Sequence, residues 1–419
     1  MENIFDVIVI GGGPAGMMAA GRAAECGASV VLLEKNTRLG EKLLISGGGR
    51  CNLTNATFDP QVLLKKYGVA EKFLYSPFSK FGVEETLDFF HIRNMPTKVE
   101  PGNRVFPGSD RSQSVFEVLE EYMMEGGVVV RPESVVVSIE VHDGSISGMT
   151  LADGDLIVGK RYILATGGKS HPETGSTGDG FKWLKAIGHT IIPPDPSLVP
   201  IRVKEPWVKE LSGISFEDAK LSIFQNGKKQ GSNRGKLLFT HVGLSGPLVL
   251  NMSKDIGESL KYGETEVSVD FFPILDAKAM DTKIQSVFSE NLNKQIKNVL
   301  REIAVPLLIP VLLHLASIDS EKEVNSITKE ERLAIGKLLK DFRLQVAGLL
   351  GPEKAIVTSG GVSLTEVDFS TMRSRLYSNL FLVGDILDID RPSGGYSLQL
   401  CWTTGFVAGE SVTEYTTPF

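Results

Sequence analysis

The segment Gly11-Gly12-Gly13-Pro14-Ala15-Gly16 constrains the fold of this chain most, because it contains the pattern G-x-G-x-x-G between a strand and a helix. Residues 5–10 are mostly apolar, as in a strand inside a parallel sheet, and residues 14–26 are rich in Ala and Met. A second apolar stretch at 29–33 ends at Glu34, 23 residues after Gly11. Together these features predict a βαβ unit that binds a dinucleotide.

Each residue of this unit has a distinct expected role. Gly11 permits a tight turn, Gly13 lets the backbone approach a pyrophosphate, and Gly16 lets the helix pack closely on the strand. The free N–H groups at the start of the helix attract the phosphates. Glu34 is expected to accept hydrogen bonds from the hydroxyls of the adenosine ribose.

The remaining elements predict an interrupted domain. Short strands are expected at 128–131, 135–141, 146–151, 156–158 and 161–165, and prolines crowd the stretch 193–200. Strand-like sequence with an Asn226-Gly227 turn follows, then helical sequence from about 276 to 351. We expect an α/β, Rossmann-like domain at 1–194 and 356–419, an inserted β-rich, barrel-like domain at 195–275 and an inserted helical domain at 276–355.

The C-terminal segment indicates which dinucleotide binds. A predicted strand at 380–383 leads into Gly384-Asp385, and Gly394-Gly395 precedes a predicted helix at 396–415. A carboxylate at a strand end suits ribityl hydroxyls, and a helix N-terminus suits the flavin edge that becomes negative on reduction. Because there is one G-x-G-x-x-G unit and it is N-terminal, FAD is favoured over NAD.

Composition bounds the possible partners. The 44 basic and 51 acidic residues give a net charge of −7, so we expect no nucleic-acid partner. The three cysteines form no CxxC pair, and there is no HExxH motif, so we expect no metal site and a reducing, cytoplasmic location. The longest apolar run, 303–316, is too short to span a bilayer, so we expect no membrane partner; the oligomeric state stays open.

Several longer motifs resemble a bacterial flavoprotein family of NAD(FAD)-utilising dehydrogenases that includes bile-acid Δ4,6-reductase and aminoacetone oxidase types. The matching segments are EKLLISGGGRCNLTN at 41–55, ATGGKSHPETGSTGDG at 165–180, LLFTHVGLSGP at 237–247, VTSGGVSLTEVD at 357–368 and GDILDIDRPSGGYSLQLCWTTG at 384–405. The chain departs from the family at Asp385, where Glu is usual, at Arg391-Pro392-Ser393, where Gly-Pro-Thr is common, and at Ser397, where Asn is frequent.

The resemblance implies a two-dinucleotide-binding-domain flavoprotein fold with a barrel-plus-helical insert. It also implies a set of FAD-binding residues spread over both ends of the chain. These are Gly11, Gly13, Ala15, Gly16, Glu34, Lys35, Lys42, Ser46, Gly47, Gly48, Arg50, Cys51, Asn52, Val136, Thr166, Gly167, Gly384, Asp385, Gly394, Gly395, Tyr396, Ser397 and Leu398.

Four residues are candidates for catalysis. Arg50 could pair with a phosphate or a substrate carboxylate, or form a structural ion pair. His171 and His241 lie in glycine-punctuated loops and could act as general acid or base, or be structural. Tyr396, at the expected helix start beside the flavin, is a candidate proton donor.

Three functions follow from these observations. The first is an FAD enzyme that takes hydride from NAD(P)H and reduces an activated C=C bond in a small apolar molecule. The second is an FAD-dependent oxidase of a small amine that passes electrons to O2, which needs no nicotinamide site. The third is a non-catalytic flavin-bearing scaffold, or an RNA-associated module whose insert binds a macromolecule; the net charge of −7 argues against RNA.

Overall fold

The computed structural model describes residues 5–351 and 357–414. It divides into two compact units, residues 1–197 with 352–419 (unit 1) and residues 198–351 (unit 2). Strand β11 (Ile191–Ser197) spans the expected crossing at 194/195, whereas the expected return at 355/356 lies outside the described residues. The β-rich and helical segments, expected as two domains, share unit 2. In the described ranges no helix is long and apolar enough to cross a membrane.

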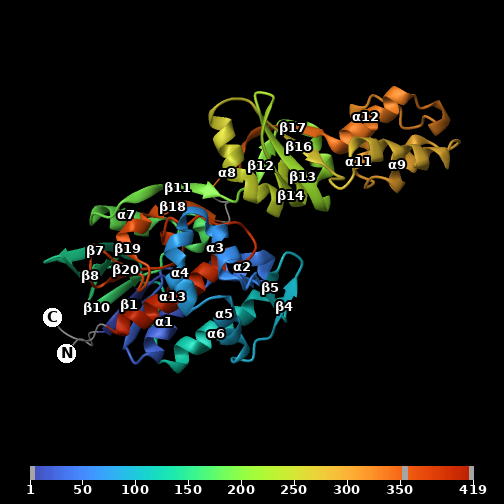
Figure 1. The fold of residues 1–419 in the computed structure, drawn as a ribbon. Helices are drawn as coiled ribbons and strands as arrows, with labels where there is room; N and C mark the ends of the chain where they lie inside the picture. Colours follow the sequence, from blue (N-terminus) through green and yellow to red (C-terminus); the bar gives the residue numbers. More distant parts are fainter. Residues whose placement is uncertain (1–4, 352–356, 415–419) are drawn as a thin grey trace. The chain divides into compact units, whose positions relative to one another are not determined.

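Unit 1 is built on a seven-stranded sheet in the order β19-β20-β21-β10-β1-β2-β6 (Figure 1). The five strands from β21 to β6 are parallel, and β19 and β20 extend them antiparallel. Their bounds are β1 Phe5–Ile10, β2 Val30–Leu33, β6 Val129–Arg131, β10 Gly159–Leu164, β19 Val367–Asp368, β20 Arg373–Ser374 and β21 Leu380–Leu382. With β1 at its centre, the parallel part is the Rossmann-like sheet that the sequence predicts.

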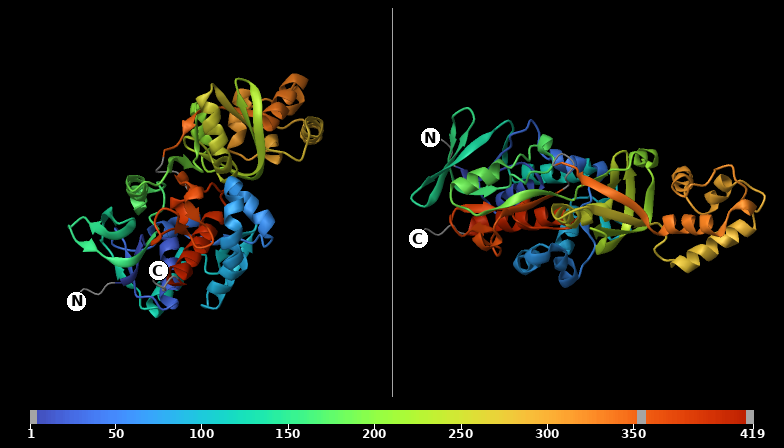
Figure 2. Two further views of the ribbon diagram at one scale, coloured as in Figure 1. Left: turned by 60° about the vertical axis from the view of Figure 1, so that its left-hand side comes forward. Right: turned by 90° about the horizontal axis from the view of Figure 1, so that it is seen from above.

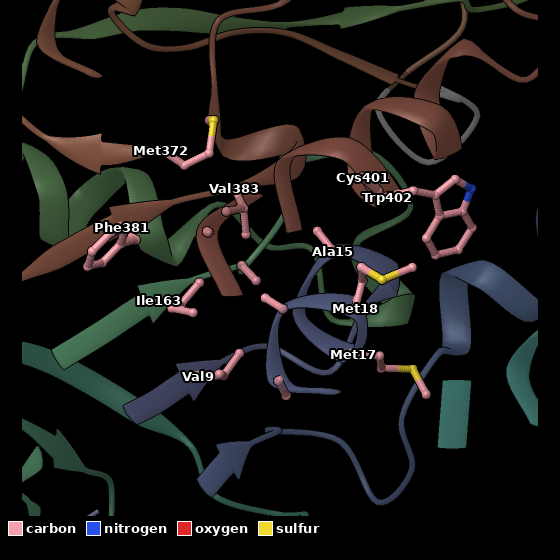
Figure 3. Close-up of a cluster of buried hydrophobic side chains, with 14 of the residues drawn as sticks. Val9, Ala15, Met17, Met18, Ile163, Met372, Phe381, Val383, Cys401 and Trp402 are labelled. Atoms are coloured by element: carbon pink, nitrogen blue, oxygen red, sulfur yellow. The ribbon is translucent and has the colours of Figure 1, made fainter. Parts of the chain in front are cut away.

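Two helices from opposite ends of the chain pack together on this sheet. These are α1 (Pro14–Glu25) and α13 (Tyr396–Glu414). A Cβ at Gly405 would lie 2.5 Å from the Ala15 carbonyl oxygen, so the helices approach more closely than larger side chains would allow. In Figure 3, side chains of the sheet such as Val9 and Phe381 share one core with Met18 and Trp402 of these helices.

Further elements of unit 1 surround this core. Two three-stranded sheets have the orders β3-β5-β4 and β7-β8-β9, and β11 pairs with β18 (Val357–Val362). Their strands are β3 Thr54–Asn55, β4 Thr97–Glu100, β5 Arg104–Pro107, β7 Val136–His142, β8 Ser145–Leu151 and β9 Leu156–Ile157. The helices are α2 Glu41–Gly49, α3 Pro60–Leu64, α4 Glu71–Lys80, α5 Val83–His91, α6 Ser112–Glu125 and α7 Asp179–Ala186.

Unit 2 contains a six-stranded antiparallel sheet that closes on itself, because β12 pairs with both β15 and β17. Its strands are β12 Ile201–Val203, β13 Ser215–Gln225, β14 Lys228–Thr240, β15 Gly243–Ser245, β16 Thr265–Asp270 and β17 Phe342–Leu349. Asn226 and Gly227 both have positive φ (48° and 77°), which is the tight hairpin turn expected from their sequence.

Two segments of unit 2 differ from the expectation. Residues 342–349 were predicted as part of the helical segment but form β17, where buried side chains alternate from Phe342 to Val346 and complete the barrel. Within the predicted strand-rich segment, α8 (Pro247–Lys261) is a helix that starts at Pro247 and buries one face. Helices α9 Ala277–Ser289, α10 Ile296–Val299, α11 Leu308–Leu315 and α12 Lys329–Lys340 gather at one end of the barrel (Figure 2).

Candidate functional site

A cavity that is partly open to solvent lies in unit 1 at the carboxyl ends of β1, β10 and β21. In doubly wound folds this edge of the sheet is where ligands bind. The walls come from five separate parts of the chain. They are residues 10–15, residues 33–36 with 38 and 40–42, Ser134 with Val136, residues 165–167 with 174–179 and Trp183, and Val383 with Asp385 and Cys401.

The glycine-rich loop forms the floor of the cavity at the start of α1. Gly11 has φ +104°, and a Cβ there would lie 2.6 Å from the Ala165 carbonyl oxygen. A Cβ at Gly16 would lie 1.9 Å from the Gly11 carbonyl oxygen. At Gly13, the residue preceding α1, an added Cβ would meet no protein atom within 4 Å. Gly11 and Gly16 are therefore required by the protein itself, whereas Gly13 leaves open space at the helix N-terminus.

Glu34 lies in the wall where β2 ends. Its carboxylate is buried and accepts backbone N–H bonds from Gly12 at 2.7 Å and Asn36 at 2.8 Å. Two carboxylate oxygens offer about four acceptor positions, so capacity remains for the two hydroxyls of a ribose. The arrangement fits the adenosine half of a dinucleotide.

Another part of the wall combines a partly buried lysine with an unsatisfied hydroxyl. Burial holds the pKa of the Lys42 amine below its usual value, and the Asp385 carboxylate opposes that shift. Among the described residues, Thr166 Oγ1 is buried without a hydrogen-bond partner. An orphaned donor and a desolvated amine in one cavity fit an anionic, oxygen-rich ligand such as the diphosphate of FAD.

Trp183 on α7 is a half-buried wall residue that sequence reasoning missed. It lines the same cavity as Val136, one of the residues that the resemblance assigns to FAD binding. The glycine-rich stretch before α7 also lines the wall, and Lys35 is tied to it by bonds to Thr177 (2.6 Å) and Asp179 (3.2 Å). The glycines of this stretch are the sequence feature that could have indicated this part of the cavity wall.

The loop after α2 and the turn before α13, both expected to hold the flavin ring, contact each other. Asn55 Nδ2 donates to the Gly394 carbonyl oxygen at 3.1 Å, and the Asn52 amide oxygen accepts the Gly395 N–H at 3.0 Å. A Cβ at Gly395 would lie 2.3 Å from the Thr54 backbone. The fold therefore joins two segments that lie more than 300 residues apart in sequence.

The expected FAD residues divide into two groups. Ten line the cavity: Gly11, Gly13, Ala15, Glu34, Lys35, Lys42, Val136, Thr166, Gly167 and Asp385. The others do not line it: Gly16 and Gly384 lie behind it, and the 46–52 loop and 394–398 turn form the contact described above. The binding roles of this second group stay predictions.

None of the four catalytic candidates is part of the cavity lining. Arg50 is paired with Glu100 and Asp110 and stacks on Phe106 with 4.2 Å to the ring centroid. His171 Nδ1 lies 2.8 Å from a carboxylate oxygen of Glu173.

The other two candidates lie in different surroundings. Tyr396 is buried, and burial raises the pKa of its phenol, so it stays protonated at neutral pH. His241 is exposed in unit 2. The catalytic roles of all four stay predictions.

Cys51 illustrates a structural role inside a predicted binding loop. Its side chain is fully buried, and burial raises the pKa of its thiol to about 12. A thiol that stays protonated is a poor nucleophile. The expected backbone contact of this loop with FAD does not require the sulfur.

The comparisons with known proteins agree with this geometry. A family model described as the HI0933-like protein Rossmann domain matches residues 5–411. A 3-dehydro-bile acid delta(4,6)-reductase of Clostridium scindens is 33% identical over 97% of this chain and 98% of its own. A ribosomal RNA dihydrouridine synthase of Escherichia coli is 29% identical over 97% of this chain and 98% of its own.

Solved structures show the same fold at low identity. The 3-ketosteroid delta1-dehydrogenase from Sterolibacterium denitrificans has a TM-score of 0.55 at 14% identity, covering 98% of this chain and all of its own. The E. coli quinol-fumarate reductase flavoprotein chain has a TM-score of 0.54 at 16% identity, covering 98% of this chain and 70% of its own.

Proposed function

The chain belongs to the HI0933-like family of Rossmann-domain flavoprotein oxidoreductases, and from this premise we propose that it reduces a C=C bond activated by a conjugated carbonyl group. The proposed cofactor is FAD, the electron donor NAD(P)H and the substrate a small, largely apolar molecule. FAD, when bound, supplies the hydride chemistry. The observation that carries the proposal is the full-length match to a bile-acid delta(4,6)-reductase at 33% identity.

The cavity residues divide the work of holding the cofactor. The N–H groups at the start of α1, beside Gly13, would face the diphosphate, and Glu34 would bind the ribose hydroxyls. Lys42 and Thr166 would complete the hydrogen bonds of the anionic part. Because the sequence contains one G-x-G-x-x-G unit, NAD(P)H would bind transiently rather than in a second site of this kind.

A second candidate substrate is a uridine in ribosomal RNA, favoured by full-length relatives from two organisms with that activity. Formation of dihydrouridine also adds hydrogen across a C=C bond, so the reaction class is the same. The net charge of −7 is divided unevenly: unit 2 holds 21 basic and 19 acidic residues, and unit 1 holds 23 and 32. The expectation of no nucleic-acid partner, which rested on the whole-chain charge, therefore does not apply to unit 2.

The test is anaerobic reduction of the FAD-loaded protein followed by visible absorbance. NADH or NADPH is expected to bleach the flavin band, and a steroid 4,6-dien-3-one is expected to restore it. Restoration by unmodified ribosomal RNA alone, with dihydrouridine detected by mass spectrometry, would favour the second candidate. Bleaching by small amines and none by NAD(P)H would overturn both in favour of an oxidase.

A further inference from the structure

Arg391 is a buried arginine near the cavity whose three guanidinium nitrogens are all engaged. It pairs with the Asp385 carboxylate, donates through Nε to Ser397 Oγ at 3.1 Å, and donates through Nη1 to the Ile389 carbonyl oxygen at 2.5 Å. Its side chain has no exposed surface. Each of its nitrogens therefore already holds a group of the protein, which suits a positioning role.

The two side-chain partners of Arg391 belong to different parts of the site. Asp385 follows β21 and lines the cavity, whereas Ser397 lies in the first turn of α13, in the segment expected at the flavin ring. Five donors in a planar fork make arginine suited to fix two groups at once. Arg391 thus fixes the strand-end carboxylate to the start of α13.

The two cations Lys42 and Arg391 lie within electrostatic range of each other. Lys42 and Arg391 are two cations that act on the single carboxylate of Asp385. A further acid that acts on Lys42, Glu173, is more than half exposed and lies beside His171. Two cations close together repel each other, so an anionic group bound beside them would stabilise both.

We propose that Arg391 is a positioning residue for FAD that fixes Asp385 and Ser397 and whose charge favours the reduced over the oxidised cofactor. The inference rests on the proposed function only in taking FAD as the cofactor. Electrons added to the ring bring negative charge. A fixed, desolvated guanidinium held at the start of α13, where the flavin edge is expected, would stabilise that charge more strongly than water would.

The test compares Arg391→Met and Arg391→Lys with the control Arg375→Met, which removes an exposed arginine of the same unit. The readouts are the FAD dissociation constant, from fluorescence quenching, and the two-electron midpoint potential, from equilibration with a reference dye. For R391M we expect about tenfold weaker FAD binding and a tenfold smaller preference for reduced FAD, which corresponds to a potential lower by about 30 mV. R391K is expected to keep a midpoint potential closer to that of the wild type, because lysine keeps the positive charge. It is expected to lose affinity for FAD, because lysine lacks the planar guanidinium that holds two groups at once.

A midpoint potential of R391M equal to that of R375M would overturn the proposal. If R391M does not fold, an R391K protein with unchanged affinity and unchanged potential overturns it as well. Failure of the wild-type protein to bind FAD is a separate outcome that contradicts the proposed function itself.

Discussion

Gly16 lies so close to Gly11 that a Cβ on Gly16 would be 1.9 Å from the Gly11 carbonyl oxygen, whereas a Cβ on Gly13 would meet nothing within 4 Å. Gly16 is required by the packing of α1 on β1. Gly13 is required only if a ligand occupies the space in front of it. Substitutions at Gly16 and Gly13 can therefore test helix packing and ligand binding separately.

Gly13→Ala is expected to leave the melting temperature without FAD nearly unchanged and to weaken FAD binding about tenfold, or 1.4 kcal/mol. Gly16→Ala is expected to destabilise the protein by about 1–3 kcal/mol or more, because backbone must move. Thermal unfolding and FAD titration of both variants measure this. Wild-type FAD affinity in G13A would show that no phosphate approaches this glycine.

Thr166→Val removes the buried hydroxyl that has no partner among the described residues. Without FAD we expect stability unchanged or raised by about 1 kcal/mol, because an unsatisfied polar atom is replaced by an isosteric methyl group. We expect FAD to bind more weakly, because the cofactor would lose its hydrogen bond to the Thr166 hydroxyl. Calorimetry with and without FAD measures both effects. The control is Thr413→Val, at a half-buried threonine near the end of α13 whose hydroxyl donates to the Glu410 carbonyl oxygen. Lower stability without FAD combined with wild-type affinity would contradict this role.

Trp183 is expected to stack on the adenine ring, because it lines the cavity together with Val136 and Glu34. Trp183→Ala should weaken FAD binding by about 1–3 kcal/mol, and Trp183→Phe should retain most of the affinity. ADP titration monitored by tryptophan fluorescence gives a second measure, with Trp207→Phe in unit 2 as the control. Quenching by ADP that persists in W183F would contradict the assignment.

His189 is expected to make stability depend on pH. It is buried between Glu366 (2.9 Å) and Ser374 (3.1 Å), and burial holds the pKa of its imidazole below the usual value. Ser374 Oγ already accepts the N–H groups of Leu376 and Tyr377, so its hydroxyl donates to a neutral ring.

The unfolded chain therefore binds a proton at higher pH than the folded chain does. Stability should be complete above about pH 6.5 and decline as the pH falls below it. His189→Asn should flatten this slope between about pH 6.5 and 5, whatever its effect on absolute stability. Denaturant unfolding across that range measures the slope, and His142→Gln, at an exposed histidine, should leave it unchanged. An equal slope in H189N and wild type would contradict the assignment.

The predictions that succeeded concern local patterns. The βαβ unit from 5 to 33, the strands between 128 and 164, the hairpin at Asn226-Gly227 and the helix after Gly395 all form as expected. Their signals are periodicity and glycine, which act within a few residues. The missed strand at 342–349 follows a helix directly, and its partners β12 and β16 come from much earlier in the chain.

By itself, the sequence determined the glycine loop, the acid after the second strand and hence the dinucleotide character of the site, because these depend on spacings along one short segment. Only the tertiary structure decided which side chains share the cavity. It brought Trp183 and Thr166 to the nucleotide loop, paired Arg50 with Glu100 and Asp110, and fixed Arg391 between Asp385 and Ser397. Such contacts depend on how distant elements pack, and no local pattern of residues encodes that packing.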